Sequence, residues 1–220
     1  MHRHTQAPEF HLPPSLCEDD PFFLTLPPLP FLDELSEQKF PTESFMPGSV
    51  KKVEPLLLRA LHIWERTLGP DDPLVAYTLY NLAEIFRMQG RYDEAQRHYQ
   101  HGLRINEQCF GSEHTEVALI LAGLANLYRD QGKSVEAEPL YQRALAIREQ
   151  HLGPLHPETA QTLHDLAICS QRQGKLDTAR SLAQRALGIR LQALGEAHPK
   201  TIETQRLSTQ LAQEQRQTEK

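Results

Sequence analysis

The sequence has few cysteines: Cys17, Cys109 and Cys169 are the only three in 220 residues, and none belongs to a Cys-x-x-Cys pair. Cysteines this few and this scattered do not support a disulfide framework and fit a reducing compartment. No apolar run approaches the roughly 18 residues that a membrane span requires. Seven prolines interrupt the first 30 residues, so no secretion signal is recognisable. We therefore expect a cytoplasmic protein with no membrane contact.

A basic excess is also missing. The net charge is −6, and residues 1–50 account for all of it, because they hold eight acidic residues and only Arg3 and Lys39 as bases. The remaining residues hold 21 acidic and 21 basic side chains and are neutral. A nucleic-acid-binding protein needs a basic surface that releases counterions from phosphates. We therefore expect no nucleic acid among the partners.

What the sequence does contain is a repeat. Gly90, Gly132 and Gly174 are 42 residues apart, and each is followed five residues later by an alanine. The same spacing relates further sets of residues, among them Leu82, Leu124 and Leu166, and Gly69, Gly111, Gly153 and Gly195. A fixed period of this length is typical of a stacked repeat array. Because such arrays function through the surface that the stacked units share, the pattern favours binding over catalysis.

Apolar residues within each unit recur at helical spacing, first on one face and then, after a Gln-Gly turn, on a second. We predict full repeats of two helices at residues 73–109, 115–151 and 157–194, a half repeat at 53–69 and a capping helix at 200–215. Together they form an array over residues 51–216. The half repeat lacks a first helix because Pro41 occupies the position that corresponds to Ala83, in a helix interior. The last helix carries polar residues at core positions, as a cap should.

Local chemistry supports these boundaries. Gly69 and its equivalents suit a left-handed helix end, and Pro73 and Pro157 suit a first helical turn. Asp72 is a good N-cap residue, whereas His156 and His198 are weaker candidates at the same position.

The first 50 residues differ from the rest. They contain nine of the sixteen prolines and six of the eight phenylalanines, with no sustained helical or strand period. This composition predicts a disordered, acidic tail rich in proline and phenylalanine. Its middle, Leu16 to Leu35, mixes acidic and apolar residues, so we interpret it as a docking segment.

The repeat motif resembles a known family. Leu166 to Gly174, Ala179, Ala186-Leu187 and the run Leu152-Gly153-Pro154-Leu155-His156-Pro157 resemble the tetratricopeptide repeat (TPR), in the 42-residue form of kinesin light chains. Similar arrays form C-terminal regions of bacterial signalling ATPases. The resemblance implies an all-α, right-handed superhelical solenoid of antiparallel helix pairs, whose first helices line a concave groove that binds peptides. Ser170 and Ala183 depart from the pattern, so the third unit is expected to pack less tightly.

A helical wheel identifies the residues of that groove. Side chains about 100 degrees from the core face of the first helices fall on one side of the array. The candidate peptide-binding residues are Tyr77, Tyr80, Glu84, Arg87, Asn126, Arg129, His164 and Arg206. Arg87 and Arg129 occupy equivalent positions, where two guanidinium groups suit a ligand carboxylate. The alternative is that these arginines pair with Glu84, Asp130 or a neighbouring repeat.

Motifs for catalysis or cofactor binding are weak. Gly132-Lys133-Ser134 looks like the end of a phosphate loop, but Leu127 occupies the position of its first glycine. His98 and His101 are three residues apart on a helix with no third metal ligand beside them. Neither free cysteine of the array has an organised base. We predict no enzyme activity, no cofactor and no metal.

The sequence therefore predicts a non-catalytic adaptor or sensor that binds a linear, acidic peptide segment of a protein partner. One alternative is an autoinhibited module whose own tail contacts the groove. Another is an oligomerising regulatory fragment of a larger signalling protein, with an interface formed by Val53, Leu56, Leu57 and Ala60. Of the possible oligomeric states, a monomer is favoured.

Overall fold

In the computed structural model, the described residues 47–218 form eight α-helices and contain no strand. The predicted tail lies outside the described residues, apart from 47–50, which are helical. The helices are α2 (Pro47–Thr67), α3 (Pro73–Met88), α4 (Tyr92–Phe110), α5 (Thr115–Asp130), α6 (Ser134–His151), α7 (Pro157–Arg172), α8 (Leu176–Leu194) and α9 (Pro199–Thr218). The half repeat was expected from residue 53, but α2 begins at Pro47, because proline is compatible with a first helical turn.

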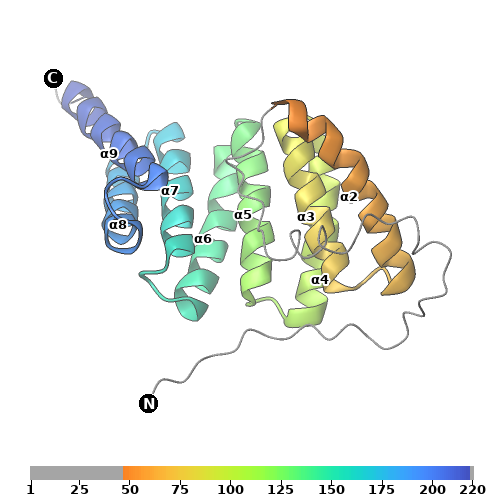
Figure 1. The fold of residues 1–220 in the computed structure, drawn as a ribbon. Coiled ribbons are helices and arrows are strands. Elements are labelled where there is room, and N and C mark those ends of the chain that lie inside the picture. The colour runs from red at the N-terminus through yellow and green to blue at the C-terminus, as the bar shows by residue number, and fades with distance from the viewer. Residues whose placement is uncertain (1–46, 219–220) are drawn as a thin grey trace, which may run out of the picture. The chain divides into compact units, whose positions relative to one another are not determined.

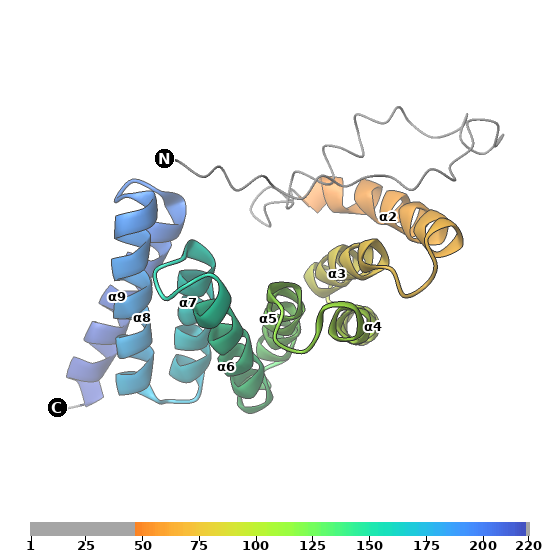
Figure 2. The same cartoon turned by 90° about the horizontal axis from the view of Figure 1, so that it is seen from below.

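The helices stack in chain order, from α2 at one end to α9 at the other (Figure 1). Helices α3 and α4, α5 and α6, and α7 and α8 form three hairpins, and each second helix also packs against the first helix of the next unit. Consecutive first helices contact one another as well, from α3 through α5 and α7 to α9. Figure 2 shows α2 beside α3 and α9 beside α8 at the two ends. The predicted all-α solenoid is confirmed.

The core repeats along the stack because the sequence repeats. In each hairpin an isoleucine of the second helix packs on apolar residues of its own first helix. Ile105 packs on Val75, Ala76 and Leu79. Ile147 packs on Val117, Ala118 and Leu121, and Ile189 packs on Ala160 and Leu163. Ala95, Ala137 and Ala179 are fully buried at the start of the second helices, where a small side chain lets two helices approach closely.

Gly90 allows the tight turn between the two helices of the first unit. Its φ is +74°, its N–H donates to the Arg87 carbonyl at 3.0 Å, and the next N–H, of Arg91, donates to the Phe86 carbonyl at 2.8 Å. This pair of bonds is the Schellman motif, and it satisfies carbonyls that the helix end leaves without partners. The same bonds form at Gly132 and Gly174.

The glycines between units differ from expectation. Gly111 and Gly195 have φ of 85° and 83°, but their ψ values are 162° and 169°. The expected left-handed helical conformation is therefore wrong at these two positions. The backbone instead takes an extended course with positive φ, which only glycine adopts readily.

Histidine caps the first helices of the later units, a role that the sequence analysis ranked as weak. Nδ1 of His114, His156 and His198 accepts a hydrogen bond from the backbone N–H two residues later, at 3.2 Å in each case. In the first unit Asp72 takes this role through a shorter bond of 2.8 Å to the Leu74 N–H. An imidazole nitrogen can thus replace the usual carboxylate or hydroxyl oxygen.

This difference predicts that His156→Asp will raise the free energy of unfolding by about 0.5 kcal/mol. A carboxylate is a preferred N-cap, and its negative charge interacts favourably with the helix dipole at the N-terminus. Urea unfolding followed by circular dichroism measures the change. The reciprocal substitution Asp72→His is the matched control and should lower stability by a similar amount. A loss of stability in His156→Asp would contradict the prediction.

Candidate functional site

Three of the predicted site residues, Glu84, Arg87 and Arg129, take part in a chain of ion pairs that crosses three units. Nη2 of Arg87 donates to Oε2 of Glu84 on the same helix at 2.8 Å, and Nη1 donates to Asp130 of α5. The Arg87 side chain is only 16% exposed. Burial lowers the pKa of Arg87, but Glu84, Tyr99 and Asp130 raise it by more, so the net shift is upward. Arg87 therefore stays charged and holds α3 against α5.

Arg129 repeats this arrangement one unit later. Its Nη1 donates to Oδ1 of Asp165 on α7 at 2.9 Å, and its Nε lies 3.6 Å from Oδ1 of Asp130. Burial lowers the pKa of Arg129, while Asp165 and Asp130 raise it overall. Asp130 thus lies between the two arginines, with 26% of its side chain exposed. Both arginines therefore pair with carboxylates of this chain, which is the alternative to ligand binding that the sequence left open.

A second set of contacts joins the two helices of each unit. The Tyr99 hydroxyl donates to Glu84 in the first unit, and the Tyr141 hydroxyl donates to Oδ1 of Asn126 at 2.6 Å in the second. In the third unit the equivalent positions hold Ala183 and Ile168, which are apolar. The donor and the acceptor change together. Because the Ile168 side chain has no polar group, the third unit does not need a tyrosine hydroxyl at position 183.

Both candidate tyrosines of α3, Tyr77 and Tyr80, are partly exposed. The Tyr80 ring packs at 6.0 Å from the Tyr99 ring, and burial together with the nearby Glu84 carboxylate raises the pKa of its hydroxyl. Tyr80 therefore also contributes to the packing of α3 on α4 through its contact with the Tyr99 ring.

The last two candidates lie near the C-terminal end of the stack. His164 is only 2% exposed, with Nδ1 3.2 Å from the Thr204 hydroxyl and Nε2 3.5 Å from a Glu203 carboxylate oxygen. The nearby His164 imidazole lowers the pKa of the Glu203 carboxyl. Arg206 is exposed on the same helix, α9. The structure thus places His164 inside the contact between α7 and α9, and Arg206 on the surface.

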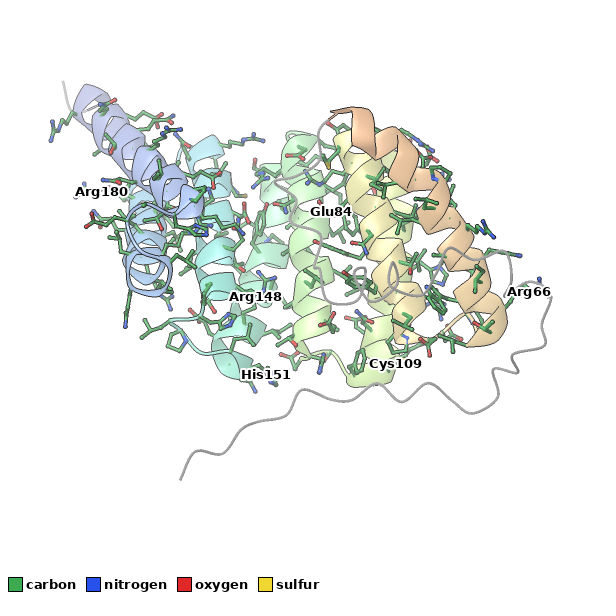
Figure 3. All side chains as sticks on the ribbon, in the orientation of Figure 1. Arg66, Glu84, Cys109, Arg148, His151 and Arg180 are labelled. Carbon is green, nitrogen blue, oxygen red and sulfur yellow. The ribbon has the colours of Figure 1, made fainter. Side chains whose placement is uncertain are left out.

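A further set of polar residues was missed by the sequence analysis. Near the C-terminal end of each second helix, one side chain donates to a backbone carbonyl ten residues later, in the first turn of the next unit: Asn106 to Glu116 at 3.3 Å, Arg148 to Glu158 at 3.2 Å and Arg190 to Lys200 at 2.7 Å. Both arginines also bond a threonine hydroxyl, Thr162 and Thr204 respectively. Figure 3 labels Arg148 on α6. These three residues share one position of the 42-residue period, which could have drawn attention to them. The spacing alone, however, does not show that an arginine at this position is buried.

The motifs considered for other chemistry have structural roles. Gly132 forms the turn between α5 and α6, and Ser134 is the first, buried residue of α6. Nδ1 of His98 contacts the Glu94 carbonyl at 2.8 Å, and its ring packs on Phe86. Within residues 47–218 no three His, Cys, Asp or Glu side chains are grouped as metal ligands, and no helix is both long and apolar enough to cross a membrane.

Comparison with known proteins agrees with this repeat geometry. The sequence model of the tetratricopeptide repeat matches residues 51–108, 103–150, 116–192 and 158–220. The chain belongs to the tetratricopeptide repeat family. The sequence matches none of the curated proteins with which it was compared.

Solved structures with the same TPR architecture include two of particular interest. BtubC (BKLC) from P. vanneervenii is 26% identical, with a TM-score of 0.67, and the alignment covers 76% of this chain and 66% of that one. A putative kinesin light chain from P. anserina with nearly identical TPR-like repeats is 24% identical, with a TM-score of 0.66 and coverage of 86% and 87%. The similarity to the second shows the fold alone. TPR repeats indicate a protein–protein interaction module.

Proposed function

We propose that this TPR chain is a non-catalytic adaptor or sensor that binds a linear, acidic segment of a partner protein along its first helices. The observation that carries the proposal is the position of Asp130 between Arg87 and Arg129. Asp130 is the most exposed of the three residues. A carboxylate of a ligand is able to take its place, so the two partly buried guanidinium groups keep an anionic partner throughout the exchange.

Neighbouring side chains support the same proposal. Tyr77 is partly exposed one helical turn before Tyr80 and supplies aromatic contact area. Asn126, on α5, accepts the Tyr141 hydroxyl through its oxygen, and within residues 47–218 no hydrogen bond engages its amide N–H groups. A ligand with an acidic residue and an apolar anchor fits this combination. A cytoplasmic location is part of the proposal, since three scattered cysteines fit a reducing compartment.

The test uses linear peptides selected against the full chain from a random display library. We expect acidic residues to be enriched, and the double substitution Arg87→Ala and Arg129→Ala to weaken the selected peptides about 10-fold to 100-fold. The matched control removes two arginines of the second helices, Arg143 and Arg185, which pair with glutamates there. This control should leave peptide affinity unchanged.

Asp130→Asn separates a binding role from a purely structural one. It removes the carboxylate that competes with the ligand, so acidic peptides should bind roughly threefold to tenfold more tightly. If the arginines serve only to hold the units together, this substitution will lower the unfolding midpoint and leave affinity unchanged. Selection of peptides with no acidic residue, or equal losses in both arginine pairs, would also refute the proposed site.

A further inference from the structure

A small pocket lies where the turns of the first two units meet. It has a volume of about 380 Å³ and is lined by Gly90, Tyr92, Asp93, Gln131 and Lys133. The first three belong to the turn between α3 and α4 and to the start of α4, and the other two belong to the turn between α5 and α6. We call it the Lys133 pocket. Pockets of roughly 300–1,000 Å³ are the usual size for small-molecule sites.

At the junctions on either side, an ion pair occupies the corresponding place. Between α2 and the first unit, Nη1 of Arg91 donates to Oε1 of Glu54 at 2.7 Å. Between the second and third units, Nζ of Lys175 donates to Oε2 of Glu138 at 2.7 Å. Bonds from Gln89 and Arg91 lower the pKa of the Glu54 carboxyl, and the bond from Lys175 lowers that of Glu138. A carboxylate is therefore a favourable partner for the basic residue at this position of the repeat.

In the Lys133 pocket this ion pair is incomplete. Lys133 continues the series of basic residues 42 positions apart, but the glutamate series is interrupted by Gln96, which is neutral. Within residues 47–218 no carboxylate pairs with Lys133, whose ammonium lies 5.9 Å from the centroid of the Tyr128 ring. The Lys133 side chain is exposed. A carboxylate from outside the chain is therefore able to reach it.

Two acceptors of the same pocket also lack partners. Oε1 of Gln131 is buried and has no hydrogen-bond partner among the described residues. The exposed Asp93 carboxylate pairs with no cation in that part of the chain, and it does not pair with Lys133 across the pocket. A buried acceptor without a donor costs free energy, so a ligand that donates to it gains affinity. The pocket thus presents one cation and, apart from it, two acceptors.

We propose that the Lys133 pocket binds a free α-amino acid. The ligand carboxylate pairs with Lys133, the ligand ammonium donates to Asp93 and to Oε1 of Gln131, and Tyr92 offers an aromatic surface to the ligand side chain. Because the pocket carries one charge of each sign, it favours a small zwitterion over a purely anionic or purely cationic ligand. The proposal concerns the turns of the array and does not depend on how the first helices bind a partner.

The test titrates the isotope-labelled full chain with each of the twenty free amino acids and follows its amide resonances by NMR. We expect at least one amino acid to shift the resonances of the pocket residues with a Kd of about 0.1–1 mM, since exposed ion pairs are individually weak. The N-acetyl derivative of that amino acid lacks the ammonium, and its methyl ester lacks the carboxylate. Each should bind about 10-fold more weakly or worse.

Gln96→Glu is the most informative variant, because it supplies the glutamate that both neighbouring junctions have. The new carboxylate should pair with Lys133 and weaken amino-acid binding about 10-fold or more. Lys133→Gln and Asp93→Asn should each weaken it to a similar extent. Lys175→Gln is the matched control, since this lysine occupies the same repeat position but already pairs with Glu138, and it should leave the affinity unchanged. Amide resonances outside the pocket verify that each variant folds.

No shift of the pocket resonances at about 10 mM of any amino acid would overturn the proposal. Unchanged affinity in both Gln96→Glu and Lys133→Gln would also overturn it, because Lys133 would then not hold the ligand. Equal binding of the acetylated and esterified forms would show that the two charges are not recognised. Loss of amino-acid binding in the Arg87→Ala and Arg129→Ala variant but not in Gln96→Glu would place the ligand on the first helices instead.

Discussion

Gly123→Ala is expected to lower the free energy of unfolding by about 1–3 kcal/mol, the usual range for an overpacked core. A Cβ at Gly123 of α5 would lie 2.6 Å from Cε1 of Tyr99 and 3.1 Å from Cε2 of Tyr80. Tyr99 is fully buried, and its hydroxyl is bonded to Glu84. The ring therefore has no free space to move into, and the methyl group must displace the contact between the first two units.

Gly188→Ala is the matched control. Gly188 is an exposed position within α8, and a Cβ there meets no atom within 4 Å. Alanine should raise stability by about 0.5–1 kcal/mol, because it lowers the entropy of the unfolded chain and has the higher helix propensity. Urea unfolding of both variants gives the comparison. Equal effects of the two substitutions, or a Gly123 variant as stable as the parent chain, would show that Tyr99 does not fill this space.

Arg148→Asn is expected to lower the free energy of unfolding by about 2–4 kcal/mol, since hydrogen bonds of a buried charged group are worth more than neutral ones. Arg148 is 5% exposed and bonds the Glu158 carbonyl and the Thr162 hydroxyl. Asparagine is too short to reach Thr162, which then loses its donor. The preceding unit, however, has Asn106 and Ile120 at these same two positions.

The double substitution Arg148→Asn and Thr162→Ile copies that natural pair into the next junction. We expect it to be at least about 1 kcal/mol more stable than the sum of the single effects predicts, because contacting residues couple. Denaturant unfolding of the parent, both single variants and the double variant gives the coupling energy. Additive effects within error would mean that the two positions act independently. The joint change from Asn106 and Ile120 to Arg148 and Thr162 would then have no energetic cause.

Much of the fold was predictable because the period repeats the same local signals three times. Helix-breaking Gln-Gly turns, prolines at first turns and alanines at close contacts all lie within a few residues of the structure that they specify. The predicted all-α TPR solenoid is therefore confirmed. Histidine is a better helix cap in this chain than its residue type suggests, since an imidazole is an uncommon acceptor there and only the position of its ring shows that it acts as one.

The candidate site was less readable from the sequence. A helical wheel places Arg87, Arg129 and His164 on one side of their helices, but it does not say what lies opposite. The structure puts Asp130 and Asp165 beside the arginines and α9 against His164. Their availability to a ligand is a property of neighbouring units, which are about 40 residues away in the sequence.

The sequence by itself determined the helix pairs, their number and their order, because these depend on periodicity and on residues close together in the chain. Only the tertiary structure decided which polar side chains are buried, as with Arg148 and Arg190, and which large apolar side chains are exposed, as with Leu56 of α2. The physical reason is distance: helix formation and termination are local, whereas burial and ion pairing depend on residues that stacking brings together.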